Sequence, residues 1–334
     1  MPRILSGVQP TGNTHLGNFI GAFRQWVDMQ HDFEAFYPVV DLHAITLAYD
    51  PEELADRTLE VAAILLAGGL DPEVCTVFVQ SHVPEHTELA WLLNHLATVG
   101  ELRRMTQFKA KAEAGGEGAL PAGYFNYPVL QAADILIYQA DLVPVGEDQR
   151  QHLELTRDVA QRFNARFGET FVIPEAYIPK VGGRVMDLQV PTAKMSKSSA
   201  SPAGRIEIID PPEVIRRKVR SAVTDSGREV LARPDKPAIS NLLEMFSVAT
   251  GETVGELEQA YAGRGYGDFK ADLADAVVDS LAPLQERYHE LRDDPAHLAG
   301  ILEAGAAKAQ AVARANLALA KERMGFLARA APQG

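Results

Sequence analysis

Residues 4–18 read Ile4-Leu5-Ser6-Gly7-Val8-Gln9-Pro10-Thr11-Gly12-Asn13-Thr14-His15-Leu16-Gly17-Asn18. The apolar pair at the start predicts a short strand, and the segment from Phe19 onward has the periodicity of a helix. The loop between them gathers Gly, Asn and His where a helix N-terminus exposes unpaired N–H groups to an anion. This strand, loop and helix predict a phosphate-binding turn at the edge of a sheet.

A second cluster suited to phosphate lies about 180 residues further on, at Lys194-Met195-Ser196-Lys197-Ser198. Its two ammonium groups are three residues apart among small side chains. Lysine suits a polyphosphate because its compact charge on a mobile stem can follow charge that shifts during a reaction. Taken singly, the first cluster is more often a turn with a helix cap, and the second a solvated face. Their order, and the strand before the first, favour ATP.

Short apolar runs alternate with helix-period segments in the first half of the chain. The runs are 4–5, 36–40, 76–79 and 142–145, and the helical segments include 52–67, 86–98 and 149–166. This alternation is typical of a parallel sheet with crossover helices, in which ligands bind beyond the carboxyl ends of the strands. Gln9, Asp41, Gln80 and Gly146 each follow a run directly, so we expect four segments to meet in one crevice.

The second half has a different pattern. After Pro191 the segments have helical periodicity, apart from a short apolar run at 205–209, and 304–324 predicts a final helix. The sequence therefore predicts an α/β fold, a Rossmann-like nucleotide-binding domain followed by a smaller, all-helical domain. Residues 112–123 are rich in glycine and predict a mobile surface loop.

Composition narrows the class of protein. The chain has 334 residues, of which 46% are apolar, enough for two domains with their own cores. No apolar run is long enough to span a bilayer and the start lacks a signal-peptide pattern, so we expect a cytoplasmic protein without a membrane. The single cysteine, Cys75, excludes an internal disulfide and reads as a buried thiol.

Charge is unevenly distributed. The net charge is −13, yet residues 191–236 hold ten basic and six acidic residues. The densest basic cluster is Arg216-Arg217-Lys218-Val219-Arg220, for which a solvated helix face is the simplest interpretation. A polyanion such as RNA would be held largely by such residues.

These motifs resemble the class I aminoacyl-tRNA synthetases, whose signatures are written H-I-G-H and K-M-S-K-S. The second matches letter for letter, and the first has Leu16 and Asn18 in place of Ile and the second His, which is typical of the tryptophanyl and tyrosyl subgroup. The resemblance to bacterial tryptophanyl-tRNA synthetases covers essentially the whole chain. It also rests on the segments 6–10, 41–46, 104–109, 146–149 and 221–226.

The resemblance implies an organisation and an activity. Residues 1–188 would form the catalytic domain, a C-terminal helix at about 297–330 would pack back onto it, and 189–296 would form a tRNA-binding domain that includes the lysine loop. The implied reaction joins L-tryptophan to ATP as tryptophanyl-adenylate and then transfers it to the terminal adenosine of tRNA(Trp), releasing pyrophosphate and AMP. Mg²⁺ would bind through the phosphates, with no metal site built by the protein, and the working form would be a homodimer.

Adenylate formation needs no protein nucleophile, because the substrate carboxylate attacks the α-phosphorus itself. The protein must align the reactants and stabilise the departing pyrophosphate. The residues expected to do this are Lys194, Lys197, Lys111, His15 and Asn18. The Asp148 carboxylate could accept hydrogen bonds from the ribose hydroxyls. By resemblance, Val185 and Met186 would line the adenine pocket. The full predicted ATP site is Gln9, Gly17, Asn18, Gly146, Asp148, Gln149, Val185, Met186, Lys194, Ser196 and Lys197.

The amino acid to be activated depends on Gln131 and Asp134, which share one face of an apolar helix. Indole N–H is a pure donor that Asp134 could accept, whereas a phenol could also be satisfied by this pair. Tyrosine therefore remains open on these two residues. The predicted amino-acid site is Ser6, Gly7, Gln9, Asp41, His43, Tyr127, Gln131, Asp134 and Gln149. Phe125 is a further candidate wall, although a core aromatic is an equal alternative for it and for Tyr127.

The predicted tRNA contacts are Arg216, Arg217, Lys218 and Arg220. The apolar segment 86–105, with Trp91, Leu92, Leu93 and Leu96, is a candidate dimer interface or an ordinary core helix. Three alternatives remain for the function. They are a tyrosyl-tRNA synthetase, a nucleotidyltransferase of the same fold that never binds RNA, and a catalytically idle amino-acid sensor.

Overall fold

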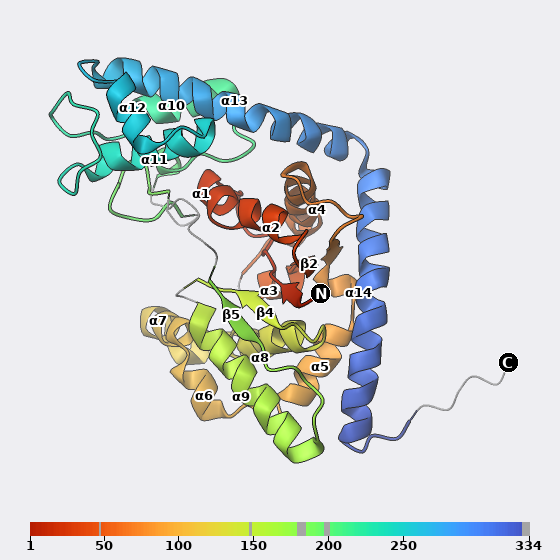
Figure 1. Ribbon diagram of the computed structural model, residues 1–334. Coiled ribbons are helices and arrows are strands. Elements are labelled where there is room, and N and C mark those ends of the chain that lie inside the picture. The colour runs from red at the N-terminus through yellow and green to blue at the C-terminus, as the bar shows by residue number, and fades with distance from the viewer. Residues whose placement is uncertain (47, 147–148, 179–184, 197–200, 329–334) are drawn as a thin grey trace.

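A parallel sheet of five strands lies at the centre of the computed structural model, which describes all residues except 47, 147–148, 179–184, 197–200 and 329–334 (Figure 1). The strands are β1 (Arg3–Leu5), β2 (Glu34–Val39), β3 (Thr76–Val79), β4 (Leu142–Pro144) and β5 (Glu175–Tyr177). Their order is β3-β2-β1-β4-β5. The direction in which strands are added therefore reverses between β1 and β4, and a crevice at the carboxyl ends is expected there.

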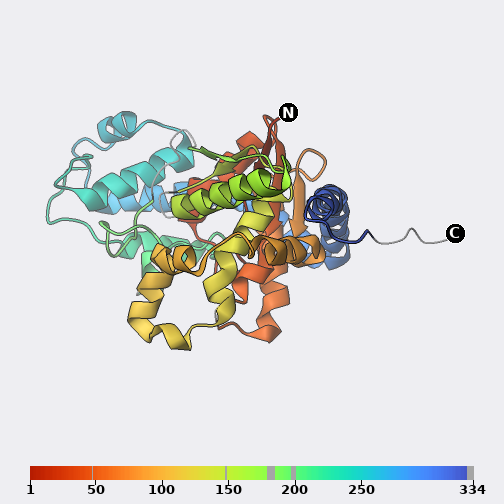
Figure 2. The ribbon, with the colours of Figure 1, turned by 90° about the horizontal axis from the view of Figure 1, so that it is seen from below.

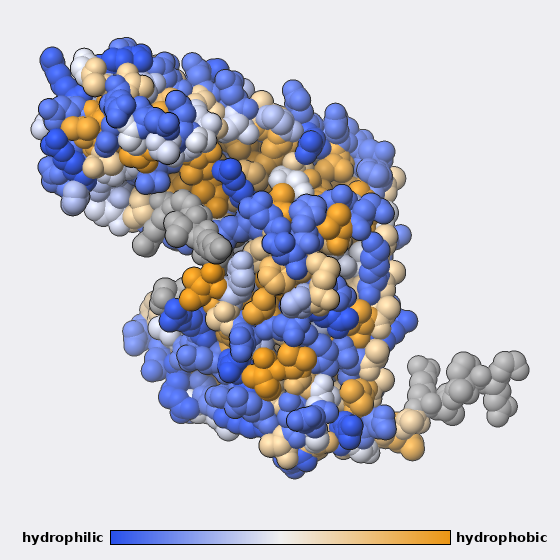
Figure 3. All heavy atoms as spheres, viewed as in Figure 1, coloured by the Kyte–Doolittle hydropathy of each residue, from blue (hydrophilic) through white to orange (hydrophobic). Residues whose placement is uncertain are grey.

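Helices surround the sheet and form a separate group beside it. They are α1 (Leu16–Asn18), α2 (Arg24–Met29), α3 (Asp41–Ala44), α4 (Pro51–Ala67), α5 (Glu85–Leu93), α6 (Val99–Arg104), α7 (Thr106–Gly115), α8 (Ala122–Leu136), α9 (Arg150–Phe167), α10 (Pro212–Ser221), α11 (Pro237–Thr250), α12 (Val254–Ala260), α13 (Tyr266–Asp293) and α14 (Pro295–Arg323). Helices α10–α12 and the start of α13 form the separate group, and the molecule is hollowed between this group and α7 and α9 (Figures 1 and 3). None of the described helices is long and apolar enough to cross a membrane.

Strands β1 to β4 each contribute to two apolar cores, because successive side chains point to opposite faces of a sheet. Ile4 packs into a core with α2, α4 and the helical group, whereas Leu5 packs into a core with α5, α8 and α9. The same alternation separates Val77 and Val79 from Phe78. The sheet is therefore buried on both faces, as the apolar runs predicted, and the α/β fold class is confirmed.

Helix α13 carries the chain back from the helical group (Figure 1), and α14 then lies along β3 and α5, at the edge of the molecule in Figure 2. The approach is closest at Gly305. A Cβ atom built there would lie 1.9 Å from the carbonyl oxygen of Val77, far inside any real contact. Only glycine lets the helix backbone come this near to the strand.

The structure corrects three sequence-based expectations. β5 was not predicted, because its residues are polar and largely exposed, and it is recognised only by its pairing with β4. The segment 112–123 is not one loop, since α7 continues through its alanines to Gly115 before a short 3-10 turn and α8. The run 205–209 forms no strand of its own. Cys75 is buried, as predicted.

Candidate active site

A cavity of about 330 Å³ opens between the carboxyl ends of β1 and β4. Residues 5–7 line it from the end of β1 and residues 143–145 from β4. Helix α8 closes one side with Tyr127, Gln131 and Asp134. The reversal of strand order thus creates a crevice at the carboxyl ends. The segments after β1, β2 and β4 line it as predicted, whereas Gln80 and the rest of the segment after β3 do not.

The predicted amino-acid site is largely assembled in this cavity. Its walls include Ser6, Gly7, Gln9, His43, Tyr127, Gln131, Asp134 and Gln149. The exception is Asp41, whose carboxylate accepts hydrogen bonds from the N–H (3.0 Å) and hydroxyl (2.5 Å) of Ser81. Asp41 therefore ties the end of β2 to the end of β3 and does not line the cavity. Phe125 also lies outside, with its ring 5.1 Å from that of Phe108.

Asp134 is 3% exposed and is surrounded by donors. His43 Nε2 lies 2.7 Å from its Oδ2, while Gln80 Nε2 and His86 Nδ1 lie 2.7 and 2.6 Å from its Oδ1. Burial alone raises the pKa of this carboxyl, but the hydrogen bonds from His43 and His86 outweigh it and hold the pKa below its ordinary value. Asp134 is therefore a negatively charged acceptor in the cavity wall.

The hydroxyl of Tyr127, which lines the cavity, is held by two polar partners. Its hydroxyl lies 2.6 Å from Gln107 Oε1 and 2.8 Å from His152 Nε2. Burial raises the pKa of Tyr127, so the phenol keeps its proton. These bonds fix the ring as a wall of the cavity, in agreement with its predicted place.

The predicted phosphate turn is closed by a reciprocal pair of hydrogen bonds. The Asn18 N–H donates to His15 Nδ1 (3.2 Å), and the His15 N–H donates to the Asn18 side chain (3.3 Å). A neutral imidazole that accepts at Nδ1 carries its proton on Nε2. His15 thus has the donor form that the predicted phosphate contact requires.

The sequence predicted unpaired backbone N–H groups in this turn, but two of them are already hydrogen-bonded. Residues 14–16 pair with residues 206–208 through two backbone hydrogen bonds of 2.8 and 3.0 Å, and one of the donors is the Leu16 N–H. The Asn18 N–H is directed to His15. Phosphate contacts here therefore fall to side chains rather than to these N–H groups of the helix start.

The lysine loop begins on a fixed support. Lys194 forms an antiparallel bridge with Met186, and the Met195 N–H donates to the Val185 carbonyl (3.2 Å). Asn241, buried on α11, accepts from the Met186 N–H (2.8 Å) and donates to its carbonyl (3.1 Å). The segment predicted to line adenine and the segment predicted to bind phosphates are therefore joined.

The two phosphate loops also adjoin each other. A Cβ built on Gly17 would lie 3.1 Å from His15 Nδ1 and 3.4 Å from the Met195 Cβ. Ser196 is half-buried, and Gly146 is exposed after β4. Lys111 lies exposed on α7 rather than in a loop. Asp148 and Lys197 lie outside the described residues.

Known proteins share this architecture and this sequence. The family model of tRNA synthetases class I (W and Y) matches residues 1–282. The chain belongs to this family. The tryptophan–tRNA ligase 2 of Streptomyces avermitilis is 56% identical over 330 residues, which are 98% of this chain and 97% of that protein.

Two solved tryptophanyl-tRNA synthetases are similar to this chain over nearly its whole length. The enzyme from Mycoplasma pneumoniae has a TM-score of 0.87 and 38% identity, with 98% of each chain covered. The enzyme from Campylobacter jejuni, complexed with ADP and tryptophan, has a TM-score of 0.86 and 36% identity, with 97% of this chain and 100% of that one covered.

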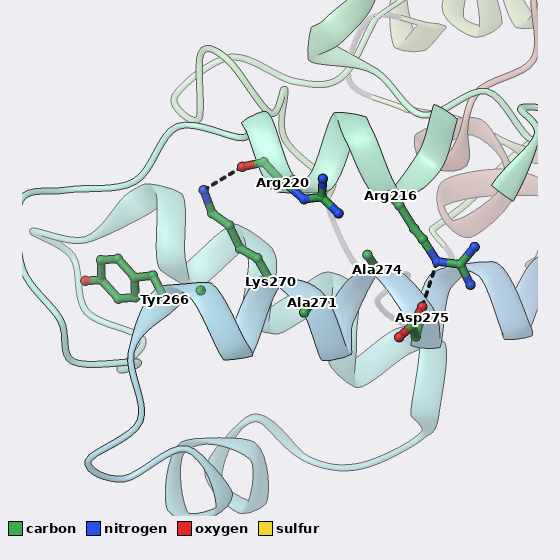
Figure 4. A pocket seen from close by; sticks show the side chains of 8 residues that line it. Arg216, Arg220, Tyr266, Lys270, Ala271, Ala274 and Asp275 are labelled. Atoms are coloured by element: carbon green, nitrogen blue, oxygen red, sulfur yellow. Dashed lines mark hydrogen bonds and ion pairs between the residues drawn. The ribbon is translucent and has the colours of Figure 1, made fainter. Parts of the chain in front are cut away.

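A basic surface of this class I synthetase lies between α10 and α13, around a cavity of about 310 Å³ (Figure 4). Arg216 Nε donates to Asp275 of α13 (2.8 Å), and Lys270 Nζ donates to the Arg220 carbonyl (3.3 Å). Arg217 and Arg220 are exposed. Three of the four predicted tRNA contacts thus reach the surface.

Lys218 departs from the prediction. It is 8% exposed, and its ammonium donates to Asp210 at 2.6 Å. Helical periodicity places it on the inner side of α10 together with Ile215 and Val219. Lys218 therefore ties α10 to the segment that directly precedes it and is removed from the predicted RNA surface.

Sequence reasoning missed several polar residues that shape the synthetase site. They are His86, Gln107, Tyr138, His152 and Asn241. Gln107 falls within a segment that carried the family resemblance, and His86 lies six residues after the predicted strand end at Gln80. Asn241 carried no signal in the sequence, because its partner is a backbone peptide brought to it by the fold.

Proposed function

We propose that this synthetase activates L-tryptophan with ATP and transfers it to the 3′-terminal adenosine of tRNA(Trp), acting in the cytoplasm as a tryptophan–tRNA ligase. The observation that carries the proposal is the cavity between β1 and β4, whose wall holds the charged acceptor Asp134. The two loops that bear His15 and Lys194 adjoin each other, and we propose that they bind the ATP phosphates. The identity to tryptophan–tRNA ligases over nearly the whole chain supports the same substrate.

In the first step a carboxylate oxygen of tryptophan attacks the α-phosphorus and pyrophosphate leaves. Asp134 and the cavity walls orient the indole, while His15 and Lys194 stabilise the charge that accumulates on the phosphates. In the second step a ribose hydroxyl of the tRNA attacks the carbonyl carbon and AMP leaves. Asp148 and Lys197 are assigned to ribose and pyrophosphate by resemblance.

Mg²⁺ is proposed to accompany the ATP phosphates, whose oxygens are ligands that it prefers. Among the described residues, no group of three or more His, Cys, Asp or Glu side chains could hold a metal ion.

Pyrophosphate exchange into ATP, measured with each of the twenty amino acids and without tRNA, tests the choice of substrate. We expect rapid exchange only with tryptophan. The cavity must hold two fused rings, and Asp134 can accept the single N–H that the indole donates. Faster exchange with tyrosine at matched concentrations would show that the pair Gln131 and Asp134 serves a phenol. Exchange without any charging of tRNA(Trp) would favour the nucleotidyltransferase alternative.

The surface around Arg216, Arg217 and Arg220 is proposed to bind tRNA phosphates. The double replacement Arg216→Glu with Arg217→Glu should raise KM for tRNA in charging by about tenfold or more and leave pyrophosphate exchange unchanged, because a polyanion is held largely by such charges. Asp275→Asn is the matched control. It releases Arg216 from its ion pair, so KM for tRNA should stay the same or fall. A double variant that charges normally contradicts the assignment.

A homodimer is proposed as the working form. The basic residues of a −13 chain are concentrated in 191–236, which leaves one subunit little positive surface for an L-shaped polyanion, whereas two copies related by a closed two-fold axis would share it. On the predicted interface Trp91 is 77% exposed, but Leu92, Leu93 and Leu96 are buried in the core of their own subunit. Only Trp91 of these can face a partner. Light scattering should return twice the chain mass of 36.3 kDa while the enzyme charges tRNA, and a monomer mass would refute the dimer.

A further inference from the structure

Asp134 is connected to a buried hydrogen-bond chain that begins outside the cavity. His86, at the start of α5, and Tyr138, just after α8, are both 0% exposed. His86 Nδ1 lies 2.6 Å from Asp134 Oδ1, and His86 Nε2 lies 2.7 Å from the Tyr138 hydroxyl. Neither residue lines the cavity. Any influence they have on a ligand must therefore pass through Asp134.

The positions of the protons follow from the chemistry of the three groups. A carboxylate only accepts, so His86 Nδ1 carries the proton of the first bond. Burial raises the pKa of Tyr138, so its hydroxyl stays protonated and can donate to the Nε2 of a neutral ring. The chain then runs in one direction, from Tyr138 to His86 to Asp134, and fixes both the tautomer and the ring orientation of His86.

The two oxygens of Asp134 differ in what remains for a ligand. Each carboxylate oxygen offers about two acceptor positions. Oδ1 accepts from Gln80 and His86, which takes up both positions. Oδ2 accepts from His43, which itself lines the cavity, and so keeps one position on the cavity side. One remaining acceptor matches the single N–H of an indole.

We propose that His86 is a positioning residue for substrate selection, which holds Oδ1 of Asp134 away from the cavity so that Oδ2 faces the indole N–H. The proposal rests on the proposed function, in which Asp134 accepts that hydrogen bond. Without the His86 donor only Gln80 still holds Oδ1, and the terminal torsion of a carboxylate is intrinsically soft. The direction of the acceptor is then less firmly fixed, even though Asp134 is still present and His43 still donates to Oδ2.

Two replacements of His86 by similarly sized side chains distinguish the loss of its hydrogen bond to Asp134 from a change in core packing. His86→Asn places its amide nitrogen near the position of Nδ1 and keeps the donor to Asp134. His86→Gln places its amide group near the position of Nε2, where the amide oxygen can accept from the Tyr138 hydroxyl, and it loses the bond to Asp134. Both are polar and can stay folded where an apolar replacement would not. Thermal melting of the full-length protein checks this for each variant.

The measurement is kcat/KM in pyrophosphate exchange with tryptophan and with benzothienylalanine, the analogue in which sulfur replaces the indole N–H. The native enzyme should prefer tryptophan by several orders of magnitude, because a site built to accept a hydrogen bond rejects a ligand that lacks the donor. His86→Gln should lower this preference at least tenfold, whereas His86→Asn should keep it within about threefold. A purely structural role would lower both rates alike and leave their ratio unchanged.

The outcomes distinguish this inference from the function on which it rests. If the native enzyme does not discriminate between tryptophan and benzothienylalanine, Asp134 does not bind the indole and that part of the proposed function fails. If the native enzyme discriminates and the Gln and Asn variants keep the same ratio, His86 does not position the acceptor and the inference is overturned.

Discussion

Replacing Asp134 with asparagine is expected to lower the preference for tryptophan over benzothienylalanine by about 10⁴, the scale on which sites of this kind reject a ligand without the matching group. The amide has one accepting oxygen, and Gln80 and His86 both require an acceptor on the Oδ1 side. The amide nitrogen therefore turns toward His43 and the cavity. There it presents a donor to the indole N–H, which is also a donor.

Steady-state pyrophosphate exchange with the two amino acids measures this effect. Asp134→Ala is expected to lose most discrimination as well, but it also leaves three buried donors without an acceptor and should melt at a lower temperature. The isosteric variant is for this reason the sharper experiment. If the Asp134→Asn enzyme keeps kcat/KM for tryptophan within tenfold of the native value, Asp134 does not bind the indole.

Replacing Lys194 with alanine is expected to lower kcat for adenylate formation by about 10² to 10³, the usual cost of one preorganised donor. The backbone of Lys194 is fixed by its bridge to Met186, so its mobile side chain starts from a defined position. Its contact should strengthen as pyrophosphate separates, so KM for tryptophan should change little. Lys308→Ala is the matched control, because Lys308 lies on α14 and donates to the Pro72 carbonyl outside the crevice.

The role of Lys194 is decided by whether the substitution changes kcat or KM for ATP. Single-turnover formation of the adenylate over a range of ATP concentrations separates the two. A variant with native kcat and a raised KM for ATP would show that Lys194 serves ground-state binding, contrary to the proposal.

The elements predicted from the sequence were those whose signal is local. The apolar runs of β1 to β4 and the periodicity of α4 and α9 reflect burial on defined faces, and the structure confirms them within a few residues. β5 is short, polar and at the edge of the sheet, so its only evidence is the register with β4. The glycines of 112–123 predicted a loop, yet the alanines before them prolong α7.

The site divides in the same way between local and long-range information. Residue types and their order predicted a phosphate turn, a lysine loop and an acceptor on α8, because each motif is written within a few consecutive residues. Most of the hydrogen-bond partners could not be predicted, because they come from distant segments. Asp41 accepts from Ser81, which lies 40 residues away just after β3, and Asp134 accepts from His43, 91 residues before it.

The fold class, the family and the kinds of groups proposed to bind ATP and tryptophan could be predicted from the chain's residues and their order. The hydrogen-bond partners of those groups depend on the tertiary structure. The N–H of Leu16 is occupied by Ile206, some 190 residues away, and the carboxylate of Asp134 is oriented by His86, which lies 48 residues before it. A buried polar group must find a partner wherever packing places one. That choice depends on the whole fold, so no local pattern in the chain contains it.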